Sequence, residues 1–345
     1  MHPSAQQQWL AQVSEPVLEP ALPICDPHHH LWDHPGNRYL LDELLADIGN
    51  NAAAGQEIGV GHNVVSTVFV ECGSMYRANG DSSLRPVGET EFVQGIAAMS
   101  ASGRYGPTRV ASGIVGYADL TLGRHVKAVL EAHVAASPKR FCGIRHATAW
   151  HAAPEIRNAH TNPTAHLMLD ETFRQGFAEL EAMGLSFDAW FFHHQLDEFT
   201  DLARTFPGVT IILDHFGGPL GIGPYAGQQD AVFGAWKDSI SALADCPNVH
   251  LKLGGINMKI NGYAWHKRAK PPSSNELVEA TGPYYEHCLQ LFGANRCMFE
   301  SNFPVDRDSC AYTILWNAFK KLSQGLDKNE KAALFHDTAT RVYGL

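Results

Sequence analysis

Histidine side chains recur where three separate apolar runs of this 345-residue chain end, and they are the residues best suited to chemistry. The first group reads DPHHH over residues 26–30. In an extended strand, residues two apart point to the same side, so His28 and His30 are expected to converge while His29 points away. Two imidazoles placed in this way can share a divalent ion. The alternative is a pair of structural histidines bonded to neighbouring loops.

Two more histidine groups follow later apolar runs. His193 and His194 are adjacent, and because adjacent strand residues diverge, only one of them can face inward. Either could instead be a partly buried histidine at a strand end. His215 follows Asp214 and precedes a glycine-rich turn at residues 217–219, which would leave its ring exposed where a strand ends.

Carboxylates and one arginine complete the set of reactive candidates. Glu300 and Asn302 are two residues apart after the last apolar run and should share one face. Glu71 ends an early run, where it could accept a hydrogen bond from a substrate. The other interpretation makes Glu71 a buried partner of Arg145.

The elements that must position these groups alternate between short apolar runs and amphipathic stretches, which predicts a (β/α)8 TIM barrel. No glycine-rich nucleotide-binding motif is present to favour an open doubly wound sheet. Residues 1–20 are interpreted as an N-terminal extension, and residues 21–345 as one barrel domain ending in a helix that packs back. The eight expected strands are Leu22–Asp26, Val64–Glu71, Arg109–Tyr117, Phe141–Arg145, Leu185–Phe192, Val209–Asp214, Val249–Leu253 and Cys297–Ser301.

Two loops are longer than a barrel requires, and both follow strands, so both are expected at the C-terminal face, where barrel enzymes keep their sites. The first, Gly73–Gly88, carries Tyr76 and could close over a ligand. The second, Gly254–Gly282, carries a local positive patch with His266 and Arg268. This patch could orient an anionic substrate, or it could be a solvated surface loop.

The composition excludes several classes of function. Apolar residues make up 45% and charged residues 18%, which is typical of a compact protein, and the net charge of −10 disfavours nucleic acids and anionic membranes as partners. No signal peptide or apolar run of membrane-spanning length is evident, and the seven cysteines include no CxxC pair. The expectation is a cytoplasmic enzyme that acts on a small molecule, with a homo-oligomer as one candidate assembly.

The combined pattern resembles the amidohydrolase superfamily from about Ile24 to Leu345. It is most similar to the group that contains the sugar lactonases, the pyrone-dicarboxylate lactonase and the sulfomuconolactonases. The stretches that carry the resemblance are DPHHHLWD, FCGIRH, FFHHQLDEF, IILDHFGGP, HLKLGG, MFESNFPVD and the ending RVYGL.

The resemblance implies a role for several residues. His28 and His30 match the histidine pair of the first strand, His194 matches the fifth-strand histidine because it precedes Gln, and His215 matches the sixth-strand histidine. Arg145 matches a basic residue near the substrate. Members of this group work with or without a metal, so the four histidines would bind a divalent ion, with zinc preferred, or polarise the substrate directly. No organic cofactor is expected.

One departure from the family pattern concerns the base that activates water. Typical members end the eighth strand with an aspartate where this chain has Asn302, and an amide cannot take up a proton as a carboxylate can. Glu300 on the same face, Asp306 from the following loop, or a histidine such as His215 could replace it. Glu300 is preferred, although it could instead be a paired carboxylate within the barrel.

The resulting hypothesis is a hydrolase that opens a small anionic or polyhydroxylated lactone. Beyond the catalytic set of His28, His30, His194, His215, Glu300 and Asn302, the residues expected to contact the substrate are Glu71, Tyr76, Arg145, His266, Arg268 and Asp306. Amide hydrolysis and decarboxylation of an aromatic or unsaturated acid are alternatives on the same scaffold. A non-catalytic ligand-binding protein is the alternative from another class.

Overall fold

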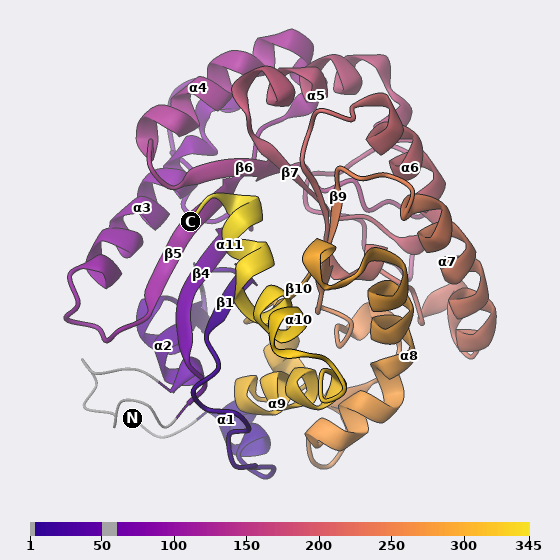
Figure 1. Cartoon of the computed structure of the whole chain (residues 1–345). Coiled ribbons are helices and arrows are strands. Elements are labelled where there is room, and N and C mark those ends of the chain that lie inside the picture. The colour runs from indigo at the N-terminus through magenta and orange to yellow at the C-terminus, as the bar shows by residue number, and fades with distance from the viewer. Residues whose placement is uncertain (1–3, 50–60) are drawn as a thin grey trace.

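The computed structural model describes residues 4–49 and 61–345, and its centre is a ring of parallel strands (Figure 1). Within these residues, eight strands form one sheet in which each pairs in parallel with the next along the chain. The predicted (β/α)8 barrel is therefore confirmed. Every strand lies at a predicted position: β1 Ile24–His29, β4 Val64–Val70, β5 Arg109–Gly116, β6 Phe141–Arg145, β7 Ser186–Ala189, β8 Ile211–Leu213, β9 Val249–Leu253 and β10 Cys297–Phe299.

The ring closes between β1 and the segment that follows β10. His29 and Phe303 form an isolated parallel bridge. The Asp26 carboxylate accepts hydrogen bonds from the Ser301 backbone at 2.9 Å and from the Tyr312 hydroxyl at 2.9 Å. Because Asp26 is fully buried, these bonds satisfy a polar group that would otherwise be costly inside the barrel. Closure of the barrel therefore brings the segment that carries His28 and His30 next to the segment that carries Glu300 and Asn302.

Helices surround the strands and cover their outer faces (Figure 1). Their ends follow ordinary sequence signals: α5 ends at Gly184, which adopts the left-handed conformation that glycine favours. The helices that follow the barrel strands are α2 Leu41–Ile48, α3 Val87–Ala101, α4 Val126–Ala136, α5 Glu171–Met183, α6 Leu196–Thr205, α7 Gln229–Leu243, α8 Ser274–Phe292 and α9 Tyr312–Leu322.

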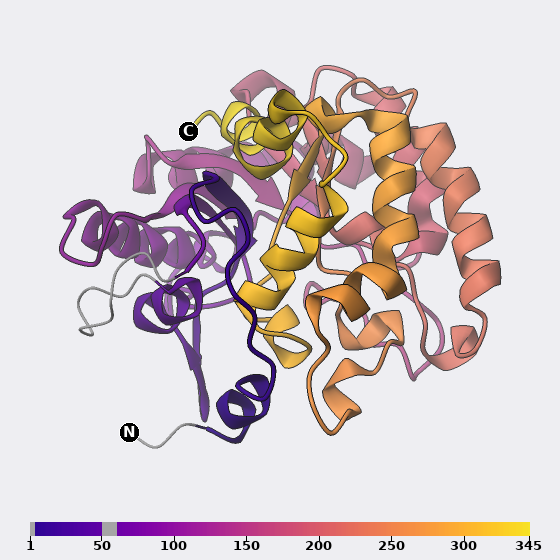
Figure 2. The same ribbon diagram turned by 60° about the horizontal axis from the view of Figure 1, so that its bottom comes forward.

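The C-terminal segment crosses one end of the barrel, where Figures 1 and 2 show α10 Lys328–Ala332 and α11 Thr338–Tyr343 over the strands. Ala339 and Tyr343 of α11 pack in one apolar cluster with residues from six strands, among them Val68, Ile212 and Met298. This segment therefore forms the floor of the barrel, opposite the end where the strand carboxyl termini meet.

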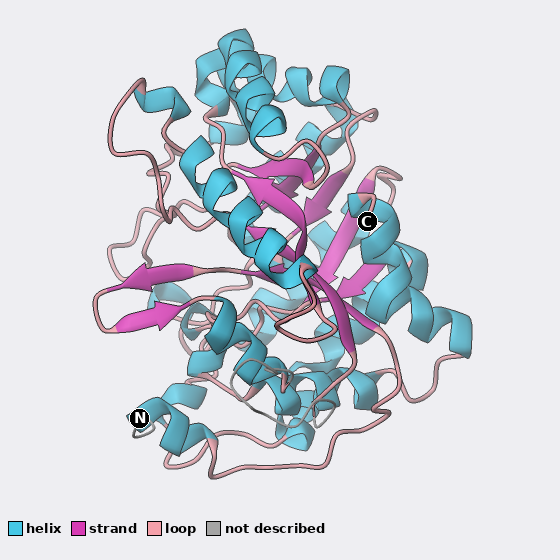
Figure 3. Cartoon of the chain, turned by 90° about the vertical axis from the view of Figure 1, so that its left-hand side faces the viewer, coloured by secondary structure: helices cyan, strands magenta, loops and turns pink. Residues whose placement is uncertain are grey.

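Other features of the fold were not predicted. A two-stranded hairpin, β2 Trp32–His34 with β3 Asn37–Tyr39, stands out from the barrel beside β1 (Figure 3). The long loop after β9 ends earlier than Gly282, because Ser273 and Glu276 form a capping box that starts α8 at Ser274. At the other terminus, α1 Ala5–Leu10 contacts the loops after β9 and β10, where Trp9 donates to the Arg268 carbonyl and Gln6 to Asp308 Oδ1. Among the described residues, no helix combines the length and apolar character needed to cross a lipid bilayer.

Candidate active site

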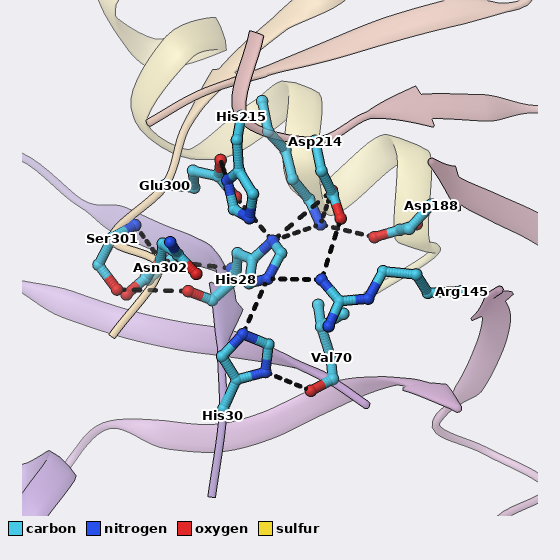
Figure 4. A network of polar contacts seen from close by, with 12 residues as sticks. His28, His30, Val70, Arg145, Asp188, Asp214, His215, Glu300, Ser301 and Asn302 are labelled. Atoms are coloured by element: carbon cyan, nitrogen blue, oxygen red, sulfur yellow. Dashed lines mark hydrogen bonds and ion pairs between the residues drawn. The ribbon is translucent and has the colours of Figure 1, made fainter. Parts of the chain in front are cut away.

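A single carboxylate links two of the predicted histidines inside the barrel mouth (Figure 4). Glu300, just after β10, accepts a hydrogen bond from His215 Nδ1 on Oε1 at 2.6 Å, and its Oε2 lies 2.8 Å from His28 Nδ1. The rings of His28 and His215 are 4.5 Å apart between centroids. All three side chains are buried, so water cannot replace these contacts. Glu300 therefore fixes the position of both imidazoles.

His30 lies on the other side of His28. Its Nδ1 donates to the Val70 carbonyl at 2.7 Å, which leaves Nε2 without a proton, 3.3 Å from His28 Nε2. His29 points away and contacts Thr67 at 2.8 Å, as the alternation of strand side chains predicts.

Arg145 at the end of β6 is held by acceptors on three sides. Its guanidinium donates to Glu71 Oε1 at 2.7 Å, to the Glu71 carbonyl at 2.6 Å and to Asp214 Oδ2 at 3.3 Å. Its Nη1 also lies 3.3 Å from His28 Nε2. Of the two interpretations of Glu71, the structure therefore shows the buried ion pair with Arg145.

Below His28 lies a second ion pair that the sequence analysis missed. Lys252 of β9 donates to Asp188 Oδ2 at 2.5 Å, and its ammonium lies 3.1 Å from Asp214 Oδ1 and 3.2 Å from His28 Nδ1. The Tyr343 hydroxyl donates to the same Asp188 oxygen at 2.8 Å. A charged residue inside an otherwise apolar strand run was the signal available for both Lys252 and Asp188.

Burial and neighbouring charges set the protonation of these groups. Burial lowers the pKa of His215 to about 3 and also lowers the pKa of His28 and His30, so all three rings are neutral near pH 7. Burial tends to raise the pKa of Asp214, but Lys252 outweighs it and holds that pKa well below its usual value. For Asp188 burial dominates and raises the pKa to about 6, against the effect of Lys252.

The site accommodates a metal ion in its geometry and charge. Among the described residues, His28, His215 and Glu300 bring one ligand atom each to within 4.8 Å of one another. The Nε2 atoms of His28 and His30 are 3.3 Å apart. Two nitrogen ligands of one tetrahedral zinc ion are also separated by about 3.3 Å, because each zinc–nitrogen bond is about 2.0 Å long. Two cations, Arg145 and Lys252, face four buried carboxylates, so a divalent ion would balance the formal charge.

Comparison with known proteins places the chain in a family. A family profile described as "Amidohydrolase" matches residues 25–345. The chain is a member of the amidohydrolase family. Protein y4mH of Sinorhizobium fredii is 33% identical over 93% of this amidohydrolase and 98% of its own length. The L-fucono-1,5-lactonase of Burkholderia ambifaria is 32% identical, over 36% of this chain and 37% of that protein.

Solved structures support the fold at lower identity. An amidohydrolase from Burkholderia multivorans with bound zinc has a TM-score of 0.68 and 21% identity, covering 93% of this chain and 99% of the other. A 2,6-dihydroxybenzoate decarboxylase from Rhizobium has a TM-score of 0.53 and 12% identity, over 93% and 98% of the two chains. At these identities the likeness concerns the barrel alone, so hydrolases and decarboxylases share this amidohydrolase's scaffold.

The structure does not bring His194 to the other three histidines. β7 ends at Ala189, and His193–Gln195 forms a single helical turn, so the alternation expected of a strand no longer applies. His194 is exposed, 5.1 Å from the His151 ring, and in the described residues no ring contact or hydrogen bond connects it to His28, His30 or His215. The expected group of four imidazoles is therefore a group of three.

The positive patch after β9 also lies outside the site. Arg268 pairs with Glu276 in the first turn of α8, and its backbone carbonyl accepts a hydrogen bond from Trp9. His266 lies beside Lys259, which pairs with Asp308 at 2.7 Å. In the described residues, no hydrogen bond or ion pair connects His266 or Arg268 to the three imidazoles, and contact of either with a substrate stays a prediction.

The remaining predicted residues lie at the rim or beside Glu300. Tyr76 is half-buried near Glu71. Burial raises the pKa of the Tyr76 phenol, and the negative charge of Glu71 raises it further. Asn302 donates its amide to Asp306 Oδ1 at 3.2 Å. Burial, reinforced by Glu300, raises the pKa of Asp306 well above its usual value, which disfavours its charged form.

We predict that glycine is required at position 255 to leave room for His215. Gly255 has φ +66°, and a β-carbon there would lie 2.1 Å from His215 Nδ1. Gly255→Ala should cost about 1 kcal/mol for the left-handed backbone and about 1–3 kcal/mol more for the collision. Urea unfolding measures both. Gly227→Ala is the matched control, because Gly227 has φ +74° and nothing within 4 Å of the added carbon. Equal losses in the two variants would contradict this account.

A second prediction concerns pH and the buried carboxylate Glu89. Burial and the neighbouring Glu71 raise the pKa of Glu89 from 4.5 to about 8. Protonated Glu89 therefore contributes to the stability of the folded protein. This contribution is fully present below pH 4.5 and is lost as the pH rises through about 8. In Glu89→Gln, the Tm should therefore fall less between pH 6 and pH 9 than in the wild type. Glu91→Gln, at an exposed neighbour, is the control. A wild-type fall that Glu89→Gln reproduces would refute the assignment.

Proposed function

We propose that this amidohydrolase opens an uncharged, polyhydroxylated lactone by attack of water, with His215 as the general base. The observation that carries the proposal is the pairing of His215 with Glu300. Because Nδ1 of His215 donates to the carboxylate, its proton is held there and Nε2 keeps a lone pair. Within the described residues, no hydrogen bond engages that Nε2. His215 is neutral near pH 7, as a base must be.

The residues around His215 support a simple sequence of proton transfers. His215 Nε2 takes a proton from water as the water oxygen bonds to the lactone carbonyl carbon. The same imidazole then gives this proton to the ring oxygen as its bond to the carbonyl carbon breaks, which yields a hydroxy acid. Glu300 stabilises the imidazolium between the two steps, and Arg145, whose Nη1 lies 3.3 Å from His28 Nε2, stabilises the charge on the carbonyl oxygen.

A zinc ion fits beside this base. His28 and His30 would hold it by their Nε2 atoms, with the Nδ1 proton of His28 toward Glu300 and that of His30 toward Val70. When bound, zinc supplies Lewis acidity that polarises the substrate carbonyl. The zinc-bound amidohydrolase of the same fold supports this choice of metal.

The charges of the site favour an uncharged substrate over an anionic one. Arg145 and Lys252 are already paired with Glu71, Asp188 and Asp214, and the carboxylates outnumber the cations. A substrate carboxylate would enter a negative, buried region without a free cation to receive it. The rim offers half-buried aromatic rings instead: Trp32 stacks on His30 at 6.1 Å, and Trp190 lies 5.0 Å from His215. Such rings suit the apolar face of a sugar ring, and the lactonase relative acts on a sugar lactone.

The substrate class is tested by a panel assay. We expect the protein to open the ring of neutral sugar lactones such as L-fucono-1,5-lactone. The reaction is monitored as acid release in an indicator buffer. We expect kcat/KM for a pyrone dicarboxylate to be lower by at least about tenfold, because each 1.4 kcal/mol of charge repulsion corresponds to that factor. Carbon dioxide release from dihydroxybenzoates, measured in parallel, would favour the decarboxylase instead. Inertness on the whole panel together with tight ligand binding would contradict an enzyme.

The base is tested by substitution of His215. His215→Gln should lower kcat by about 10²–10⁴-fold, the usual contribution of a positioned base. His166→Gln is the control, because His166 is exposed and pairs with Glu198 on the outer surface. If the two variants keep similar kcat values on the best lactone of the panel, His215 is not the base.

A further inference from the structure

The buried ammonium of Lys252 has no role in the lactone chemistry proposed above, yet it touches the first histidine of the site. Lys252 and its partner Asp188 are fully buried, and the ammonium lies 3.2 Å from His28 Nδ1. An ammonium can only donate hydrogen bonds, so this contact requires a lone pair on His28 Nδ1. The Glu300 contact at the same nitrogen, at 2.8 Å, requires the opposite, a proton on Nδ1. The two contacts compete for one atom.

The competition has two complete solutions. With the proton on Nε2, His28 accepts from Lys252 and donates to the bare Nε2 of His30, while Arg145 Nη1, 3.3 Å from the same Nε2, keeps Asp214 as its acceptor. With the proton on Nδ1, His28 faces Glu300 and its Nε2 can accept from Arg145, while the bare Nε2 of His30, 3.3 Å away, is left for a metal ion shared with His28. The position of one proton therefore decides whether the His28–His30 pair is open to a metal.

The position of the ammonium is set from the barrel floor. Asp188 receives Lys252 at 2.5 Å and the Tyr343 hydroxyl at 2.8 Å on one oxygen, and the Tyr343 ring centroid is 5.5 Å from the ammonium. Tyr343 belongs to α11, the helix that closes the barrel opposite the mouth. Lys252 is thus held within reach of His28 by groups that take no part in substrate binding.

We infer that Lys252 is a positioning residue that controls metal uptake, by placing the His28 proton on Nε2 in the metal-free protein and opposing a divalent ion at the His28–His30 pair. Its charge acts in the same direction as its hydrogen bond, because a cation so close to a ligand raises the free energy of a second cation. The inference adds a control on the zinc of the proposed function, but it can be tested without any substrate.

The first test is nitrogen NMR of the histidine rings in metal-free, full-length protein, with His28→Gln used to assign the His28 signals. We expect the wild type to carry the His28 proton on Nε2, and Lys252→Met to carry it on Nδ1, facing Glu300. Lys320→Met is the matched control, because Lys320 is also buried and lies 2.8 Å from Nδ1 of His62, outside the barrel. It should leave the His28 signals unchanged. A wild-type proton on Nδ1 would overturn the inference.

The second test measures zinc binding by competition with a chromophoric chelator. Zinc should bind Lys252→Met at least about tenfold more tightly than the wild type, while Lys252→Arg, which keeps the charge, and Lys320→Met should stay within about twofold of it. If Lys252→Met does not fold, Lys252→Gln removes the same charge and the same gain is expected. Equal or weaker zinc binding in the neutral variants would refute the inference. Because neither readout uses catalysis, an inactive lactone panel would leave this result standing.

Discussion

The site depends on one constraint, which is that the buried carboxylate of Glu300 lies in contact with two imidazoles from distant strands. An unpaired carboxylate in the barrel would be strongly unfavourable, so His28 of β1 and His215 after β8 are drawn to it. The same contacts fix the orientation of both rings. Room for this arrangement comes from Gly254 and Gly255, where any side chain would collide with Glu300 or His215.

The sequence predicted the strands well because a parallel barrel strand is buried on both faces and therefore forms a continuous apolar run. It also predicted that His28 and His30 converge, because both belong to or directly follow β1 and obey strand alternation. His194 shows the limit of this rule. It comes after the strand has ended, in a helical turn, where the direction of a side chain depends on local geometry that spacing does not record.

The missed residues share a different cause. Asp188, Lys252 and Tyr343 lie on β7, β9 and α11, and what makes them important is that they meet, which depends on tertiary packing. Arg268 shows a different limit. Its charge and its loop suggested a ligand site, but in the structure its guanidinium pairs with a nearby capping carboxylate, Glu276. Charge in a loop indicates function only where no such partner is available.

An asparagine rather than an aspartate at position 302 suits the buried charge around it. Four carboxylates already face two cations, and burial together with Glu300 raises the pKa of Asp306 beside them. An aspartate at position 302 would add a further negative charge next to Asp306 and close to Glu300. Asparagine avoids that repulsion and still donates a hydrogen bond to Asp306. Two residues back along the chain, Glu300 is the carboxylate that accepts a hydrogen bond from His215 Nδ1 at 2.6 Å.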